Sequence, residues 1–470
     1  MPSFFFKPYF NDLYKLFFSY ICILRMVTSS LYNRLFLKHI HSTHLLLCLL
    51  LAQPFVTLRA QDGDSTSREV VRGWSFGAFP TVSISNTLGF QYGVYGNLFY
   101  YGDGTSYPDP LHKITFEASH FTKGRSRFYL ALDTKRLLPG WRLTLSALYI
   151  IDPLAYFYGF NGAASPYVDS LDNRHYYALD RRFFQAFANL QRPLTDHLKL
   201  AGGLSYSHYD IGDFDDSKYD GNASSTLYHY YVAQGLIDGD ERAGGHVGEL
   251  RGGIVYDTRD IEAAPNRGLL AEVFLNGSIA SGGHHYLKAC AYFSHFVRLP
   301  LGLIPAGDPV FAYRLAYSGK LAGDVPFYMQ QIIPMLVPHT MLTEGLGSAK
   351  TMRGLFENRI VADGIAWGNF ELRVKLVKFT LLRQYFYIAV NPFFDCSIVT
   401  QSYRLQRQAA AYGVDVSSLR HDSQRLATAA GMGFKLAWNE NFIVSLELAR
   451  SFEPVLGNDF WFDAGVNYVF

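Results

Sequence analysis

The sequence contains few cysteines and no cluster of basic residues. Its four cysteines are Cys22, Cys48, Cys290 and Cys396, and the first two lie in an N-terminal segment that we expect to be removed. We expect Cys290 to face inward and Cys396 outward from a sheet, which argues against a disulfide between them, and two lone thiols give no metal site. With 42 basic against 40 acidic residues and no basic run, nothing in the sequence indicates a nucleic-acid partner.

The sequence also lacks long apolar runs. Beyond the N-terminus, no uncharged apolar stretch approaches the roughly 20 residues that a membrane helix needs. The hydrophobic residues, 49% of the chain, are spread thinly as in strands, and tyrosine (33) and phenylalanine (38) are abundant. So many aromatic rings suit the two interfacial girdles of a membrane β-barrel. The alternative is an aromatic-rich secreted β-sandwich.

The N-terminus has the pattern of a targeting signal. Arg34 and Lys38 precede an apolar run at 45–51, and the small residue Ala60 comes just before a polar stretch. We therefore predict that a signal segment is cleaved after Ala60. The residues before Met26 look like an upstream start that the cell does not use. The alternative is a genuine membrane anchor.

Strict alternation of polar and apolar residues indicates a strand with one wet and one apolar face. Over 369–376, one face receives Asn369, Glu371, Arg373 and Lys375, and the other receives Phe370, Leu372, Val374 and Leu376. This period of two is typical of a barrel strand between lipid and a polar lumen.

Similar stretches between turn residues predict about sixteen strands, each close to the roughly 9 to 11 residues of a tilted membrane strand. Their predicted starts are Trp74, Gly89, His112, Ser126, Trp141, Arg182, His197, Val247, Gly268, Tyr286, Pro309, Asn369, Tyr385, Ala427, Glu440 and Phe460. We therefore predict an all-β fold, a transmembrane antiparallel β-barrel.

The predicted connections alternate between short and long. The short ones cover 135–140, 193–196 and 439–440, and the long ones about 151–181, 209–246, 319–368 and 397–426. Short periplasmic turns and long extracellular loops are typical of outer-membrane barrels. An even strand count returns both chain ends to the periplasm.

The first and last predicted strands differ in how well their residues suit strand pairing. The last strand alternates to the terminal Phe470, an aromatic ending similar to the recognition signal of bacterial outer-membrane barrels and suited to anchoring at the interface. The first strand contains Gly77 and Pro80, and a proline cannot donate to a strand ladder. We therefore expect a weak seam between these two strands. A plain bulge in a sealed barrel is the alternative.

Four separated patches resemble one known family. They lie at 352–356 (Met-Arg-Gly-Leu-Phe), 368–373 (Gly-Asn-Phe-Glu-Leu-Arg), 393–397 (Phe-Phe-Asp-Cys-Ser) and 257–260 (Asp-Thr-Arg-Asp), the last closing at 265–268. Together they resemble the barrel of the BamA/TamA-type surface-antigen superfamily of outer-membrane insertases and translocases. Three positions depart from the family pattern: Met352 replaces valine, Leu355 displaces an aromatic residue, and Ser397 replaces glycine.

The resemblance implies a lock inside the barrel. The loop 319–368 would fold inward as a plug, so that Arg353, freed by the hinge Gly354, meets Asp395 on the wall. Alternation independently places Asp395 on the lumen face, since it shares that face with Tyr387. Without the resemblance, an Arg-Gly pair in a loop is usually a solvated turn, and an inward aspartate is ordinary lumen polarity.

Other residues of these patches receive simpler interpretations. Glu371, Arg373 and Phe393 are predicted to face the lumen and support the lock. A further group, formed by Asp257, Arg259, Asp260 and Gly268, is predicted to form a charged periplasmic turn.

The predicted organisation is a targeting segment at 1–60, a short periplasmic segment at 61–73 and a barrel at 74–470. So short an N-terminal segment leaves no room for the POTRA modules that BamA-like proteins use to collect clients. We therefore expect a separate periplasmic or lipoprotein partner. The barrel itself is expected to be monomeric and surrounded by outer-membrane lipid.

No cofactor, metal or catalytic group is expected. The aspartates between 210 and 220 do not have calcium-loop spacing, and neighbouring serine and histidine residues on strands point to opposite faces. We therefore predict that the protein is not an enzyme. The predicted function is to aid insertion or translocation of proteins or lipids at the bacterial outer membrane. The alternative is a passive pore or a structural surface antigen that has kept the fold.

Overall fold

The computed structural model describes the barrel and most of its connections. The described residues are 72–85, 88–105, 110–165, 167, 175–214, 226–262, 264–280, 283–302, 307–337, 342–348, 350–381, 384–403, 426–438, 442–457 and 460–466. Contacts divide the chain into Met1–Glu69 and Val70–Phe470, and all that follows concerns the second unit. The predicted segment 1–60, the predicted segment 61–73 except its last two residues, and Phe470 lie outside the described residues.

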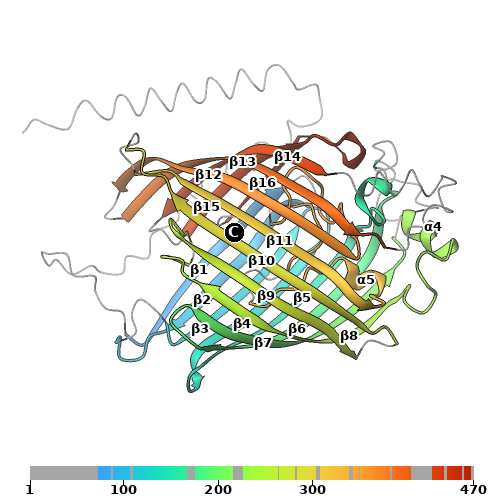
Figure 1. Cartoon of the computed structure of the whole chain (residues 1–470), viewed down its shortest axis with the longest axis horizontal. Coiled ribbons are helices and arrows are strands. Elements are labelled where there is room, and N and C mark those ends of the chain that lie inside the picture. Colours follow the sequence, from blue (N-terminus) through green and yellow to red (C-terminus); the bar gives the residue numbers. More distant parts are fainter. Residues whose placement is uncertain are drawn as a thin grey trace, which may run out of the picture. The chain divides into compact units, whose positions relative to one another are not determined.

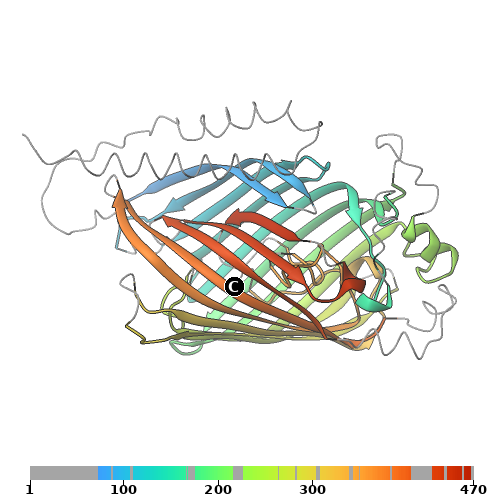
Figure 2. The ribbon, with the colours of Figure 1, turned by 90° about the horizontal axis from the view of Figure 1, so that it is seen from above.

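Sixteen antiparallel strands close into one barrel (Figure 1, and Figure 2 from above), which confirms the predicted fold class. Each strand pairs with its neighbours in chain order, and β1 pairs with β16 to close the sheet. The strands are β1 Trp74–Ser85, β2 Gly89–Tyr100, β3 His112–Phe121, β4 Ser126–Leu138, β5 Trp141–Tyr156, β6 Ala178–Pro193, β7 Leu198–Gly212, β8 Gly244–Asp257, β9 Gly268–Ala280, β10 Tyr286–Arg298, β11 Val310–Gly323, β12 Gly364–Leu381, β13 Gln384–Gln401, β14 Ala427–Trp438, β15 Phe442–Ser451 and β16 Trp461–Val466.

Helices are few and short in the described part of the chain. They are η1 Gly162–Ala164, α4 Leu227–Ala233, α5 Phe327–Gln330 and η3 Pro454–Leu456. None of these described helices has the length and apolar character to span a membrane.

The predicted strand length is wrong for much of the barrel. β12 and β13 contain 18 residues each, and β5 and β6 contain 16 each, against the expected 9 to 11 or so. Neighbouring strands lengthen together because each added residue gives its partner a further backbone hydrogen bond. These strands are therefore longer than the roughly 25 Å apolar band of such barrels requires.

Many strands begin where the alternation predicts, such as β1 at Trp74, but β12 begins at Gly364 and not at Asn369. In the additional residues at the start of β12, Ile365 and Trp367 are buried on the inner face, each 5% exposed. Because this stretch of the inner face is apolar, polar and apolar residues do not alternate before Asn369. The pattern therefore cannot locate the true start.

Alternate residues of each strand face the interior and the outer surface. On β13, Phe393 and Asp395 are 5% and 0% exposed, whereas Phe394 between them is 41% exposed. The two cysteines follow the same rule, since Cys290 is buried and Cys396 is partly exposed, and both are free thiols. A closed sheet with large exposed apolar residues on its outer face is suited to contact with a lipid bilayer.

The four longest connections lie at one end of the barrel, since each follows an odd-numbered strand of an antiparallel sheet. The long ones cover 157–177, 213–243, 324–363 and 402–426. The helices α4 and α5, which belong to two of them, lie at the same end in Figure 1. We call this the long-connection end, and the other the short-turn end.

The closing contact between β1 and β16 is brief. Among the described residues, β1 pairs with β16 at two positions, Ile84 with Ala464 and Ser85 with Asp463, but with β2 from end to end. β16 is also the shortest described strand, with 6 residues. In the part of the chain that the structure describes, fewer backbone pairs therefore join this seam than join the other neighbouring strands.

Candidate functional site

The connection between β11 and β12 has a fold of its own. It covers 324–363, which is shorter than the predicted 319–368 because the sheet extends further on both sides. We call it the β11–β12 segment. It contains α5 and isolated bridges, one of which pairs Leu346 with Ile360. The segment is thus a folded element and not a structureless loop.

Arg353 lies within this segment, and its side chain is 0% exposed. Its Nε and Nη2 donate to the two carboxylate oxygens of Asp395 on β13, at 2.8 and 2.7 Å, and its backbone N–H donates to the same carboxylate at 3.0 Å. The structure therefore brings together the two residues of the predicted lock. A bidentate contact of this kind fixes the orientation of the arginine as well as neutralising it.

Two further carboxylates surround the same guanidinium. Nη1 of Arg353 donates to Glu371 of β12 at 2.5 Å and to Glu447 of β15 at 3.2 Å. Burial by itself lowers the pKa of Arg353, but the attraction of Asp395, Glu371 and Glu447 raises that pKa well above its usual value. The arginine is therefore held in its charged form by three different strands.

The excess negative charge is neutralised by two more cations. Arg373 donates through Nε to Glu371 at 3.0 Å, and Lys435 of β14 forms an ion pair with Glu447. Three basic and three acidic side chains thus form one buried network with no formal net charge. Such balance is what makes the burial of charges tolerable. The structure places Glu371 and Arg373 in direct contact within this network.

The third predicted support residue, Phe393, lies beneath the guanidinium. The Cζ atom of Arg353 is 3.5 Å from the centroid of the Phe393 ring, a stacking that a planar cation favours. Phe393 lies opposite Gly431 of β14, where an added Cβ would stand 2.5 Å from the ring. The missing side chain of Gly431 therefore leaves room for the ring.

Gly354 allows the chain to turn at the wall. Its φ is +84°, a left-handed value that residues with a side chain rarely adopt. A Cβ added there would lie 3.0 Å from the Cβ of Ala429 and 3.1 Å from the backbone carbon of Arg450. Both conformation and space therefore favour glycine next to Arg353.

The departures from the family pattern have structural counterparts. The hydroxyl of Ser397 donates to the sulfur of Met352 at 3.0 Å, so these two unusual residues contact each other. Leu355 is 1% exposed in an apolar cluster with Trp367. The aromatic residue one position later, Phe356, packs against Tyr167 with ring centroids 5.1 Å apart.

Backbone groups next to Arg353 are also held by the wall. The side chain of Asn369 on β12 donates to the carbonyl of Thr351 at 2.7 Å, and Arg314 of β11 donates to the carbonyl of Lys350 at 2.7 Å and to Asn369 at 3.0 Å. These roles of Asn369 and Arg314 are not among the predictions from the sequence. The inward position of Asn369 at the head of an alternating strand was the available signal.

A second arginine, Arg359, was also missed. It is 0% exposed, and it donates to backbone carbonyls of two other connections: Ser165 at 2.7 Å, Val455 at 3.0 Å, Leu456 at 3.1 Å and Gly162 at 3.4 Å. Because carbonyl acceptors belong to every residue, no sequence pattern could reveal these partners. Arg359 ties the β11–β12 segment to the connections after β5 and after β15.

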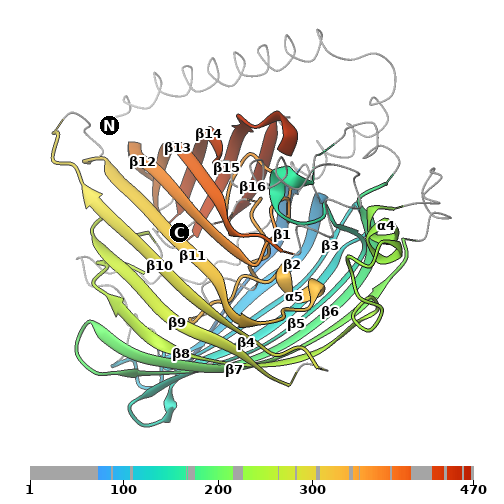
Figure 3. The same ribbon diagram turned by 45° about the vertical axis from the view of Figure 1, so that its right-hand side comes forward.

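The segment also contacts charged residues on the part of the barrel wall that lies across from the Arg353 network. Arg181 of β6 forms an ion pair with Glu344 of the segment. Arg125, in the turn between β3 and β4, donates to Glu357 of the segment at 3.0 Å and to Asp152 of β5 at 2.7 Å. In Figure 3, the label α5 marks the part of the segment that is helical.

Nearer the short-turn end, the same segment offers backbone carbonyls to the wall. Asn189 of β6 donates to Leu336 at 2.8 Å, Arg251 of β8 to Met335 at 2.9 Å, and Tyr292 of β10 to Pro334 at 2.6 Å. Together with the Arg353 network, these contacts anchor the segment to strands that lie far apart around the barrel.

The predicted turn residues lie apart from the Arg353 network and contact one another. Arg259 donates through Nε and Nη2 to the two carboxylate oxygens of Asp257, both at 3.0 Å. The Asp260 carboxylate accepts from the backbone N–H groups of Ile261 and Asn266, both at 3.0 Å. Gly268 closes the turn with a φ of +96°.

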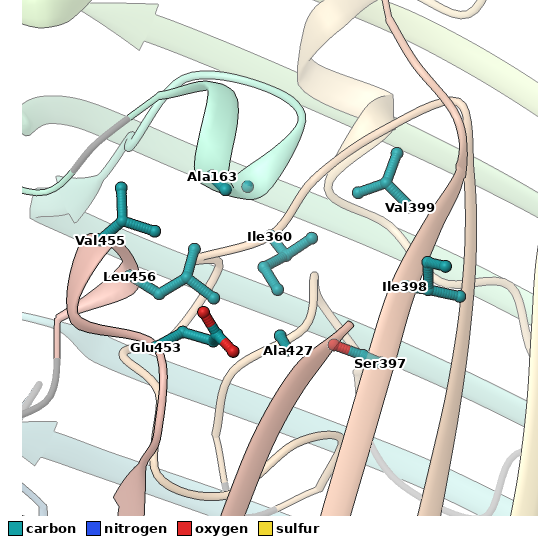
Figure 4. Close-up of a pocket in the computed structure, with 10 residues that line it drawn as sticks. Ala163, Ile360, Ser397, Ile398, Val399, Ala427, Glu453, Val455 and Leu456 are labelled. Atoms are coloured by element: carbon teal, nitrogen blue, oxygen red, sulfur yellow. The ribbon is translucent and has the colours of Figure 1, made fainter. Parts of the chain in front are cut away.

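A cavity of about 10 Å³, roughly the space of one water molecule, lies at the long-connection end. Figure 4 shows its lining, in which the Glu453 carboxylate lies among Ile360, Ala427 and Leu456. It is too small to hold a substrate. In the part of the chain that the structure describes, no group of three or more His, Cys, Asp or Glu residues could hold a metal ion.

A family model described as the Omp85 superfamily domain matches residues 112–452. Among solved structures, the chain is similar to BamA from Haemophilus ducreyi lacking POTRA domains 1-3. That match has 14% sequence identity and a TM-score of 0.53 and covers 84% of this chain and 70% of that chain. At this identity the likeness concerns the fold alone. A comparison with curated proteins gives no match.

Two further structures are CdiB proteins. CdiB from Acinetobacter baumannii has 13% identity and a TM-score of 0.43, and the match covers 85% of this chain and 60% of that chain. CdiB from Escherichia coli has 11% identity and a TM-score of 0.49, with coverages of 83% and 62%. These two scores are too low to add to the fold assignment.

We predict that Arg353→Ala and Asp395→Ala each lower the free energy of unfolding by about 3 to 5 kcal/mol, because each leaves buried charges without a partner. Unfolding by urea in detergent micelles measures the loss. The double variant should cost clearly less than the sum, since the two residues are in contact, and additive losses would contradict the contact. Arg127→Ala is the control, because its pair with Glu117 is more exposed, so its loss should be smaller.

A second prediction concerns Gly354. Replacing it with alanine should cost about 1 to 2 kcal/mol from the left-handed conformation, before any clash with Ala429. Gly433→Ala is the matched control on the same part of the wall, since an added Cβ there meets nothing closer than 3.4 Å. Equal stability of the two variants in the same urea titration would show that the turn at Gly354 is not constrained.

Proposed function

The chain belongs to the Omp85 superfamily, and from this premise we propose that it aids insertion or translocation of proteins or lipids at the outer membrane without acting as an enzyme. Membership of the family and the BamA-like barrel confirm the resemblance predicted from the four sequence patches. They support an outer-membrane barrel of the insertase and translocase type. The chemistry of the described site agrees with a mechanical role, since its charges are paired with one another.

The observation that best supports this function is the double anchoring of the β11–β12 segment. On one side the Arg353 network holds it to β12, β13 and β15, and on the other side β6, β8 and β10 hold it by Arg181, Asn189, Arg251 and Tyr292. We propose that the segment is a plug folded into the lumen from the extracellular side. Burying these charges has a desolvation cost, and a permanently open pore would not need such a network to hold one connection in place.

The proposed route past this plug is the seam. With two register pairs in the described residues, β1 and β16 can separate at a smaller loss of hydrogen bonds than any pair joined from end to end. We propose that the seam opens toward lipid while Arg353 stays bound to Asp395. Clients then pass sideways into the bilayer and need no catalytic group.

The proposed setting is the bacterial outer membrane, reached after removal of an N-terminal signal. The short-turn end then faces the periplasm and the long-connection end faces outward. We propose a monomeric barrel that works with a separate periplasmic or lipoprotein partner, which collects clients and delivers them to the short-turn end.

Locking the seam should stop the activity. In a background with Cys290 and Cys396 replaced by serine, Ile84→Cys with Ala464→Cys places two thiols opposite each other across the seam. Oxidation should reduce insertion of a urea-unfolded eight-stranded barrel into proteoliposomes by at least about tenfold, a barrier of about 1.4 kcal/mol or more. A reducing agent should restore it.

The control is a cross-link within a continuous strand pair. Val82→Cys with Tyr92→Cys joins β1 to β2 and should leave insertion unchanged after oxidation. Undiminished insertion with the seam cross-linked would exclude the gate.

Conductance in planar bilayers tests the plug, and a mostly closed barrel agrees with it. Steady open conductance would favour a passive pore or a structural surface antigen that has kept the fold.

The partner leads to a separate prediction. A tagged barrel purified from outer membranes of its own cells under mild detergent should retain a periplasmic protein or lipoprotein at a stoichiometry near one to one. A tagged porin from the same membranes should not retain it. A barrel that purifies alone, with full insertion activity in proteoliposomes, would rule out a required partner.

A further inference from the structure

The turn between β8 and β9 reaches beyond its own strands. At its tip, the side-chain oxygen of Asn266 accepts a hydrogen bond from Nζ of Lys375 on β12 at 3.1 Å. Pro265, beside it, is buried. We propose that this turn is a lid that closes the lumen at the short-turn end. The inference goes beyond the proposed function, since it concerns access to the barrel whatever the client.

The tip packs against strands far from its own hairpin. Ala264 contacts an apolar cluster of Tyr387 and Ala389 on β13, Ala437 on β14 and Ile443 on β15, whose members are at most 1% exposed. Three strands, β10 to β12, separate β9 from β13 in the sheet. A turn that lies beside β8 and β9 at its base and packs at its tip against a cluster of β13 to β15 residues must cross the barrel mouth.

The base of the turn is stiff enough to hold this position. Arg259 bonds bidentately to Asp257 and also donates to the carbonyl of Glu262 at 3.2 Å. The Asp260 carboxylate accepts three backbone N–H groups, those of Ile261, Asn266 and Arg267. Its charged residues therefore satisfy the turn's own backbone, which fixes the shape that presents Ala264 and Asn266.

The lid and the β11–β12 segment are held by one column of side chains. Along the inner face of β12, Asn369 contacts Thr351, Glu371 contacts Arg353, Arg373 contacts Glu371, and Lys375 contacts Asn266. The column thus begins at the segment and ends at the lid. The same strand face that holds the segment also holds the turn that closes the other end.

Cysteine labelling tests the lid on the whole protein. The reporter is Ala389→Cys, a position 0% exposed under the lid tip, in a background without native cysteines and with a membrane-impermeant maleimide as probe. Lys375→Met removes the hydrogen bond to the tip, and Ala264→Asp places a carboxylate against the apolar cluster. Each should speed labelling by about tenfold or more, because a lost charge-assisted hydrogen bond or a buried charge favours the open turn.

Two controls define the outcome. Ile261→Asp adds the same charge to an exposed position of the same turn and should leave labelling slow. A Leu194→Cys reporter in the turn between β6 and β7, an exposed position outside the lumen, should react alike in every variant. Equal labelling of Ala389→Cys with and without the lid changes would overturn the lid. So would an equal increase with Ile261→Asp.

Folding is checked by the heat-dependent electrophoretic shift of the barrel. If Ala264→Asp fails to fold, the milder Lys375→Met and Asn266→Ala variants answer the same question. Labelling does not depend on client insertion, so a negative seam experiment and a negative lid experiment remain distinguishable.

Discussion

A single buried cation organises this barrel. Arg353 has no exposed surface, and a guanidinium in such a place is stable only if carboxylates accompany it. Asp395, Glu371 and Glu447 come from three different strands, and Arg373 and Lys435 balance them. Once these charges are in place, the position of the β11–β12 segment is fixed against the wall. On β14, the small residue Ala429 lies next to Gly354, and Gly431 leaves room for the Phe393 ring beneath the arginine.

Besides the ion pairs of Arg181 with Glu344 and of Arg125 with Glu357, other anchors use a different chemistry. Arg359, Asn189, Arg251 and Tyr292 bind backbone carbonyls, which are present whatever side chain a residue has. Contacts of this kind tolerate sequence change on the acceptor side. The ionic network therefore requires particular residues, whereas the carbonyl anchors require only that the segment follow the same path.

The strands were predictable because they follow from a local pattern, whereas the Arg353 pair was predictable only because four sequence patches resemble a known family. Period-two alternation located most strands, and a hinged arginine facing an inward aspartate suggested the lock through a family resemblance. The start of β12 was missed because Ile365 and Trp367 are covered by the segment and break the alternation. Glu447 and Lys435 were missed since their partners come from residues distant in sequence. The turn that contains Ala264 was predicted only as a charged periplasmic turn, because the apolar partners of Ala264 lie on strands β13 to β15.

The four carbonyls around Arg359 constrain the order in which the protein can mature. Gly162 and Ser165 follow β5, whereas Val455 and Leu456 precede β16. The guanidinium cannot complete its set of acceptors until the last hairpin of the chain has been made and has reached strands from its beginning. Contacts of such long sequence separation form late and slowly. The contacts of Arg359 at the long-connection end are therefore completed only after most of the sheet has formed.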